Sequence, residues 1–169
     1  MSLLGKKILG LVSKPRKRDG KISIPSYDQA VKIGILYTYE GERKEESIDL
    51  LKQLLDQDKH IEVLCLMDNK EIASSKNPCF YVDELNHWGK IKSEIASQFL
   101  TTSYDYLIHL DFELNDILKS FLNRTQAKCR VGYYSEIGGP YYELMIGINK
   151  SVGTSNFAEQ AVKYIKSIR

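Results

Sequence analysis

The chain has 169 residues, of which 43% are hydrophobic and 27% are charged. These values are ordinary for a soluble globular protein, and the length suits a single domain. The formal net charge is +2, but it is unevenly spread, because residues 1–21 contain seven basic side chains and one acidic side chain. The rest of the chain is therefore mildly acidic, which argues against a nucleic-acid partner bound over the whole fold.

The three cysteines, Cys65, Cys79 and Cys129, are far apart in the sequence. They form neither a disulfide framework nor a Cys-x-x-Cys metal motif, and the three histidines show no metal-ligand spacing, so we expect no metal. We expect a cytoplasmic location, where free thiols persist. No apolar run reaches the roughly twenty residues needed to span a bilayer.

The first segment, residues 1–26, is predicted to be a basic amphipathic helix followed by a linker. Leu4, Ile8 and Leu11 fall on one side of that helix, with lysines on another. Such a helix can lie on an anionic membrane surface, or pack on its own domain or on a second subunit as a homodimer. Residues 27–169 are predicted to form a single α/β domain.

Short apolar runs at 31–38, 61–67 and 104–110 predict strands that are buried on both faces, as in a parallel sheet. Helical patterns lie between and after them. Residues 43–58 place Ile48, Leu51 and Leu55 on one face. Residues 87–100 do the same with Trp88, Ile91, Ile95 and Phe99. Further helices are predicted within 113–126 and 156–168.

Three more strands are predicted at 79–84, 129–134 and 142–148. The first follows Asn77-Pro78 and suits a sheet edge. Only a short turn separates the last two, so the sequence predicts that they pair antiparallel as a hairpin at an edge, because a parallel crossover takes a dozen or more residues. The fold class is therefore a three-layer α/β/α domain with a doubly wound, Rossmann- or flavodoxin-like, mainly parallel sheet.

The predicted core combines strand and helix residues of both layers. The side chains expected to be buried are Leu36, Leu64, Trp88, Ile91, Leu107, Ile108, Phe121 and Ile165.

The segment "IHLDFELND" (108–116) admits two interpretations. Asp111 follows a strand at the sheet edge where ligands of this fold class gather, which suits a functional carboxylate. Alternatively, Asp111 or Glu113 stabilises the start of the next helix through its unpaired N–H groups. His109 alternates with Ile108 and Leu110, so it should point into a helix-packed face. The structural interpretation is favoured.

The loop after the first strand, "YEGERKEES", argues against a nucleotide cofactor. A dinucleotide site would need Gly-x-Gly-x-x-Gly here, whereas only Gly41 is present among four glutamates. No cofactor is therefore expected. The segment "YYSEIGGPYYE" (133–143) is either an aromatic binding surface or a hairpin turn whose tyrosines cover a sheet edge, and the hairpin is favoured.

A ligand, if there is one, is expected at the carboxyl ends of the parallel strands. The rim would be acidic and partly aromatic, which favours a neutral or cationic polar ligand over a phosphate. The candidate ligand-binding residues are Tyr39, Glu40, Asp68, Asn69, Asp111, Phe112, Ser135 and Glu136. No catalytic residue is assigned.

The strings "VKIGILY", "WGKIKSE" and "YDYLIHLDFELNDILKSFLNRTQAKCRVGYY" resemble a family of short bacterial proteins of unknown function, over nearly the whole chain. The last string is also similar to the acceptor-side, N-terminal domain of heptosyltransferase-type GT-B glycosyltransferases. In those enzymes a Gly-Asp pair after the first strand supplies the base, but this chain has Glu40-Gly41-Glu42. It also lacks the half that binds the nucleotide sugar.

The leading functional hypothesis is a non-enzymatic binding or scaffolding domain, with a protein or a polar small molecule as partner. The first alternative is a partial glycosyltransferase-like protein with Glu40 or Glu42 as base. The second is a membrane-surface adaptor recruited through residues 1–21.

Overall fold

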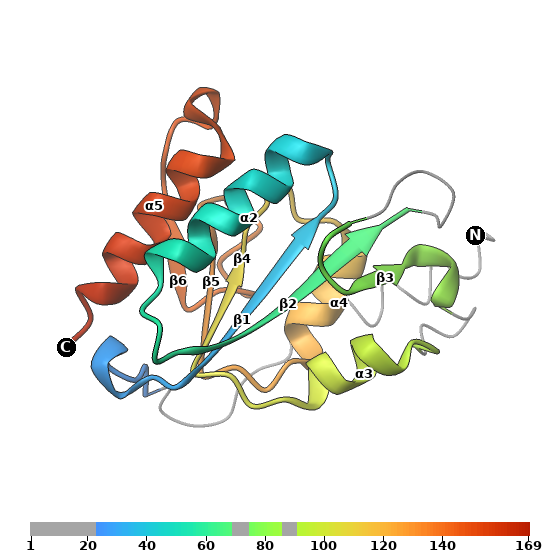
Figure 1. Cartoon of the computed structure of the whole chain (residues 1–169), viewed down its shortest axis with the longest axis horizontal. Coiled ribbons are helices and arrows are strands. Elements are labelled where there is room, and N and C mark those ends of the chain that lie inside the picture. The colour runs from blue at the N-terminus through green and yellow to red at the C-terminus, as the bar shows by residue number, and fades with distance from the viewer. Residues whose placement is uncertain (1–22, 69–74, 86–90) are drawn as a thin grey trace.

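The computed structural model describes residues 23–68, 75–85 and 91–169. In this part of the chain one six-stranded sheet has the order β3-β2-β1-β4-β5-β6 (Figure 1). Every neighbouring pair of strands is parallel. The strands are β1 (Lys32–Thr38), β2 (His60–Met67), β3 (Cys79–Tyr81), β4 (Tyr106–His109), β5 (Cys129–Tyr133) and β6 (Leu144–Ile146).

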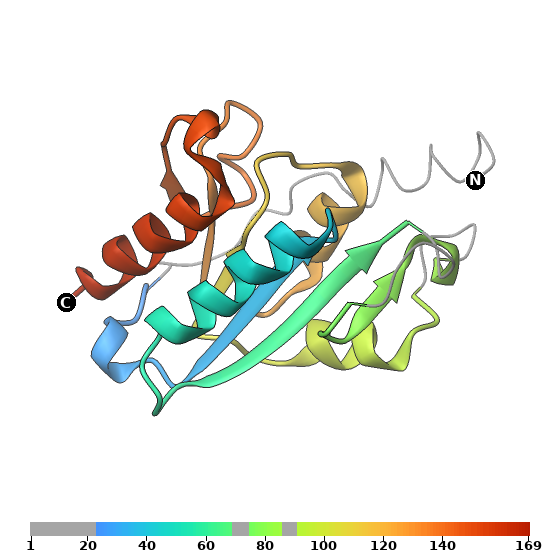
Figure 2. The same ribbon diagram turned by 45° about the horizontal axis from the view of Figure 1, so that its top comes forward.

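Helices cover both faces of this sheet, which confirms the predicted three-layer α/β architecture. One face carries α2 (Glu42–Leu54) and α5 (Gly153–Lys166), which lie side by side (Figure 2). The other carries α3 (Glu94–Thr101) and α4 (Asp116–Arg124). Short 3-10 helices are η1 (Tyr27–Gln29), η2 (Val82–Glu84) and η3 (Lys150–Val152).

Two apolar cores form because the central strands are buried on both faces. The first lies between the sheet and helices α2 and α5, and the second between the sheet and helices α3 and α4. The predicted core residues Leu36, Leu64, Ile91, Leu107, Ile108, Phe121 and Ile165 are all buried. Three predictions fall outside the described residues: Trp88, Asn69 and residues 1–22 of the predicted helix and linker.

The predicted antiparallel edge is wrong. Strand β6 runs parallel to β5, with Val131 opposite Leu144 and Tyr133 opposite Ile146. The crossover is short because β6 has only three residues, so the chain must step back only a little way along the sheet. A loop without a helix is long enough for that step.

Gly132 allows this crossover loop to lie flat on the sheet. A Cβ atom on Gly132 would stand 2.3 Å from the ring of Tyr142, so a larger residue would push the loop away. The end of the loop is fixed by Glu143, whose backbone N–H donates to the Arg130 carbonyl at 2.9 Å. The Arg130 guanidinium in turn donates to the Glu143 carboxylate at 2.6 and 3.0 Å. Tyr134, Tyr141 and Tyr142 therefore belong to a crossover and not to a hairpin turn, and Tyr133 ends β5.

Helix α3 is shorter than predicted. It begins after Ser93, whose hydroxyl accepts the Ala96 N–H at 3.3 Å, and Ile91 instead forms a β-bridge with Leu85. Since the helix begins after Ile91, the predicted single apolar face is broken, and Ile95 is 51% exposed.

The strand order shows where the chain changes the side on which it adds strands to the sheet. From β1 the chain adds β2 and β3 on one side, then returns to add β4, β5 and β6 on the other side. The switch point therefore lies between β1 and β4, and the carboxyl ends of these strands are where ligands of doubly wound folds bind.

Candidate functional site

Asp111 occupies the switch point between β1 and β4. Both of its carboxylate oxygens accept the Thr38 backbone N–H, at 2.9 and 3.1 Å, and the Lys44 Nζ atom stands 2.8 Å from Oδ1. The Thr38 N–H lies at the end of β1, where the ladder with β4 has already stopped at Leu36 and His109. The Asp111 carboxylate therefore accepts a β1 backbone N–H beyond the point where backbone pairing with β4 ends.

His109 and Tyr142 extend this group into the opposite layer. The His109 Nε2 atom lies 3.1 Å from Asp111 Oδ2, and Nδ1 lies 2.6 Å from the Tyr142 hydroxyl. Because a carboxylate only accepts hydrogen bonds, Nε2 is the donor to Asp111. Tyr142 comes from the β5–β6 crossover and Lys44 from the first turns of α2, so one polar chain joins both helical layers through the sheet.

The electrostatics of this chain favour an ionised Asp111. Burial alone would raise the pKa of its carboxyl, but the His109 ring and the Lys44 ammonium outweigh burial and lower the pKa to about 2. Burial raises the pKa of the Tyr142 hydroxyl, which therefore keeps its proton. Asp111 is thus a charged acceptor at neutral pH.

Access decides what this group can do chemically. His109 is 0% exposed, Lys44 is 3% exposed and Asp111 is 4% exposed. Both ring nitrogens of His109 already have partners. A general base must reach the proton that it removes, and these side chains are enclosed by the protein. Their arrangement therefore serves to join β1, β4, α2 and the crossover.

The helix-start interpretation of this segment needs a correction. Helix α4 is capped by Asn115, whose side-chain oxygen accepts the Leu118 N–H at 2.9 Å. Glu113 instead pairs with Lys150 at 2.5 Å. Asp111 is held by Thr38, His109 and Lys44 rather than by a helix start.

Of the candidate ligand-binding residues, Glu40 shares an ion-pair partner with Asp111. Its carboxylate lies 3.4 Å from the Lys44 ammonium, whose other partner is Asp111, and its side chain is 61% exposed. Tyr39, in contrast, packs against the core on the α2–α5 face.

The other candidates are spread along the rim. Phe112 stacks on Phe157 of α5 with ring centroids 5.7 Å apart. Ser135 accepts the Gly138 N–H through its carbonyl, at the start of the crossover. Asp68 is exposed directly after β2, and Glu136 is exposed in the first turn of the crossover. Asn69 lies outside the described residues.

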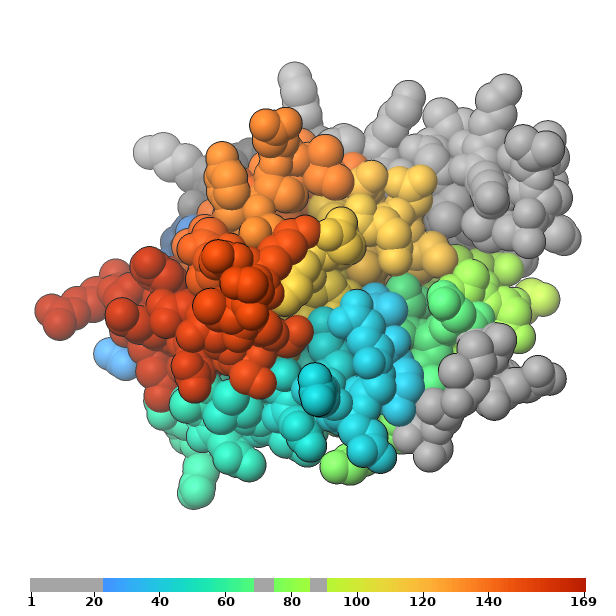
Figure 3. Space-filling model, turned by 90° about the horizontal axis from the view of Figure 1, so that it is seen from above, coloured from blue at the N-terminus to red at the C-terminus, as the bar shows by residue number. Residues whose placement is uncertain are grey.

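A hollow of about 380 Å³ opens at the same rim, between the first turns of α2 and α5. Figure 3 looks down on this rim, where the start of α2 (cyan), the segment after β4 (yellow) and α5 (red) meet. Ser47 and Ser155 hydroxyls share a hydrogen bond of 3.0 Å across the two helices. The hollow is lined by Glu40, Arg43, Lys44, Glu46, Ser47, Val152, Gly153, Thr154 and Ser155.

Sequence reasoning missed α5 as part of this rim. Gly153, with φ of +83°, turns the chain from η3 into the helix, and Thr154 and Ser155 follow directly. The signal was present in "KSVGTSN", a glycine followed by hydroxyl residues at a helix start.

A second buried polar network was also missed, between β1 and α2. The carboxylate of Glu45, which is 4% exposed, accepts from the Tyr37 hydroxyl at 2.5 Å, the Ser75 hydroxyl at 2.6 Å and the Asn77 amide at 3.0 Å. Burial and the bond to Glu45 raise the pKa of Tyr37. These partners are eight to 32 residues apart in sequence from Glu45, so their meeting depends on the fold.

Two further properties concern metals and membranes. Within 23–68, 75–85 and 91–169, no group of three or more His, Cys, Asp or Glu side chains is placed to hold a metal ion. None of the helices in these ranges has the length and apolar character to cross a bilayer.

Comparison with known proteins places the chain in a family. The model of the family of unknown function DUF6913 matches residues 2–168, nearly the whole chain. The chain belongs to this family. Searches of curated proteins and of solved structures found no match.

Proposed function

We propose that this DUF6913 chain is a non-enzymatic binding domain that holds a small polar ligand in the hollow between α2 and α5. The observation that supports this is the contrast within the rim. The buried group at the switch point is enclosed and fully partnered, whereas Glu40, Arg43 and Ser155 are exposed around an open hollow. Binding needs accessible polar groups, and the hollow provides them.

The charges of the hollow set the chemistry of the ligand. Glu40 and Glu46 oppose Arg43 and Lys44, and the Lys44 ammonium is directed to Asp111 and Glu40. The starts of α2 and α5 add positive potential. A ligand with both hydroxyl and charged groups suits this balance better than the purely neutral or cationic ligand that the sequence favoured.

Thermal unfolding in the presence of small ligands tests the proposal, because a ligand that binds only the folded state raises the midpoint. The panel contains inorganic phosphate, nucleotides, nucleotide sugars, amino acids and polyamines. We expect a rise with at least one of them that is lost in Arg43→Gln and kept in Lys119→Gln, a surface control on α4. Equal rises in both variants would contradict a site in the hollow.

Glycosyl transfer is the second candidate. Glu40 is the observation in its favour, since an exposed carboxylate after the first strand stands where the resembled enzymes place their base. A nucleotide sugar that raises the midpoint and is consumed in the presence of an acceptor sugar would replace the binding proposal. The membrane-adaptor alternative through residues 1–21 stays a prediction, and flotation with anionic vesicles tests it.

A further inference from the structure

Among the residues that the structure describes, no strand covers the outer edge of β2 over its first half. Strand β3 pairs with β2 only at Cys65, Leu66 and Met67. The chain enters that pairing through Pro78, whose carbonyl accepts the Cys65 N–H at 2.9 Å. Before Cys65, β2 has β1 on one side, and no strand of the described ranges pairs with its other side.

The backbone groups that face outward can be identified from the hydrogen bonds of their neighbours. The His60 N–H donates to Val31, and the Leu66 carbonyl accepts from Tyr39, so the even-numbered residues of β2 bond to β1. Odd-numbered residues turn the other way, as the bond from Cys65 to Pro78 shows. The N–H and C=O groups of Ile61 and Val63 therefore point to the open side, as on an edge strand.

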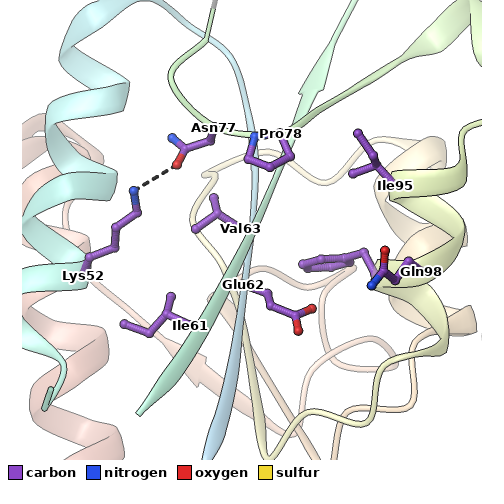
Figure 4. A pocket seen from close by; sticks show the side chains of 9 residues that line it. Lys52, Ile61, Glu62, Val63, Asn77, Pro78, Ile95 and Gln98 are labelled. Carbon is purple, nitrogen blue, oxygen red and sulfur yellow. Dashed lines mark hydrogen bonds between the residues drawn. The ribbon is translucent and has the colours of Figure 1, made fainter. Parts of the chain in front are cut away.

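These groups form the floor of a groove of about 540 Å³. In Figure 4, β2 runs through the centre, with Lys52 of α2 on one side and Ile95 and Gln98 of α3 on the other. Ile61, Glu62 and Val63 are half-buried, in contrast with the buried second half of β2. The groove therefore lies between two helices and has the exposed edge of β2 as its floor.

The two walls differ in chemistry. The α3 wall presents Ile95, 51% exposed, beside the Phe99 ring. At the α2 wall, the Lys52 ammonium donates to the Asn77 side-chain oxygen at 2.9 Å and stands 3.3 Å from Asp49. Asp49 also pairs at 3.8 Å with the exposed Lys76, which precedes β3, so two cations share one carboxylate. That wall is left with a positive charge, which an acidic side chain would complement.

We propose that the open edge of β2 binds an extended peptide segment of a partner protein, with an apolar side chain on Ile95 and an acidic side chain beside Lys52. The peptide backbone pairs with Ile61 and Val63 and continues the sheet in line with β3. Main-chain bonds supply affinity in this mode of recognition, and alternate side chains supply selectivity. A second copy fits less well, because side-by-side pairing would bring like-charged α2 walls together.

This interaction is separate from the small-ligand hollow, which lies at the carboxyl-end rim. Its test uses ¹⁵N-labelled full-length chain and a synthetic peptide, acetyl-(Val-Asp)₃-amide. The peptide should shift the Ile61 and Val63 amide signals and slow their hydrogen exchange. Two altered peptides should bind at least about tenfold more weakly. One has lysine in place of aspartate, and the other has N-methyl groups on the edge that pairs with β2.

Two variants keep the test decisive. Val63→Pro removes one outward donor while leaving the bonds to β1, and Ile95→Ser changes only an exposed wall residue. Both should weaken peptide binding without altering the response to ligands of the hollow. Unchanged Ile61 and Val63 signals at millimolar peptide, or equal binding of the N-methylated peptide, would overturn the proposal. So would a dimer in sedimentation that protects these two amides without peptide.

Discussion

At the switch point between β1 and β4 and at the outer edge of β2, strand pairing stops, but among the described residues only the switch point has partners for the backbone groups left over. Where β1 and β4 stop pairing, Asp111 accepts the next N–H, that of Thr38. Where β3 stops pairing with β2, the described residues leave Ile61 and Val63 facing a groove. The switch point joins elements of the fold to one another, and we propose that the edge of β2 binds a partner.

This difference shows that position on the fold does not by itself identify a site. The carboxyl-end rim is the expected ligand position of a doubly wound sheet, yet its central acid is occupied. Beside it, the hollow between α2 and α5 has exposed polar groups. Accessibility and partners, more than residue type, distinguish the buried Asp111 from the exposed Glu40.

The largest expected effect comes from breaking the ion pair between Lys44 and Asp111 at the switch point. Lys44→Met removes the ammonium group that pairs with the buried Asp111 carboxylate. Losing one member of a buried ion pair costs about 3–5 kcal/mol in the free energy of unfolding. Urea denaturation measures it, and Lys119→Met, which breaks a surface pair with Asp116, should cost about 0.5 kcal/mol or less. Equal costs of the two substitutions would show that the buried ion pair stabilises the fold no more than the surface pair.

The crossover that carries Tyr142 to the switch point gives the next effect. Gly132→Ala places a methyl group against the Tyr142 ring, so the loop must move and the bond to His109 must lengthen. Such overpacking costs about 1–3 kcal/mol. The control is Gly139→Ala, where an added Cβ meets no atom within 4 Å. A Gly132→Ala chain as stable as that control would show that the crossover is not held against β5.

Acid should lower the contribution of Asp111 to the free energy of unfolding in a defined pH window. The pKa of Asp111 is about 2 in the folded chain, below the ordinary 3.8. Its stabilising contribution is therefore complete above about pH 4 and is lost as the pH falls toward 2, by about 2 kcal/mol. Urea midpoints between these values should fall less steeply in Asp111→Asn than in the unaltered chain. Parallel curves would assign the acid sensitivity to other carboxyl groups.

The sequence predicted the layers and most of the sheet because buried parallel strands have a strong local signal. The apolar runs "IGILY" and "YLIH" are visible without a structure, and their order placed Asp111 at the correct rim. What failed depended on contacts between distant residues. The direction of β6 follows from Gly132 and Tyr142, and the shortening of α3 from the pairing of Ile91 with Leu85.

The candidate site divides in the same way. Glu40 and Asp111 were identified by their place after strands, which is a local property. Their different surroundings follow from Lys44, which bonds to both, and from His109, which joins Asp111 to Tyr142, a residue 33 positions after His109. A buried lysine has no local signal, because surface lysines occur in the same helical pattern.

The most direct test compares Asp111→Asn with Glu40→Gln by the same two measurements: unfolding free energy in urea, and the midpoint rise with a ligand found for the unaltered chain. Asp111→Asn should lose stability and, while folded, keep the ligand response. Glu40→Gln should stay within about 0.5 kcal/mol of the original stability and lose part of the response. A folded Asp111→Asn chain of undiminished stability that no longer responds would contradict the account, because it would make the buried acid the functional one.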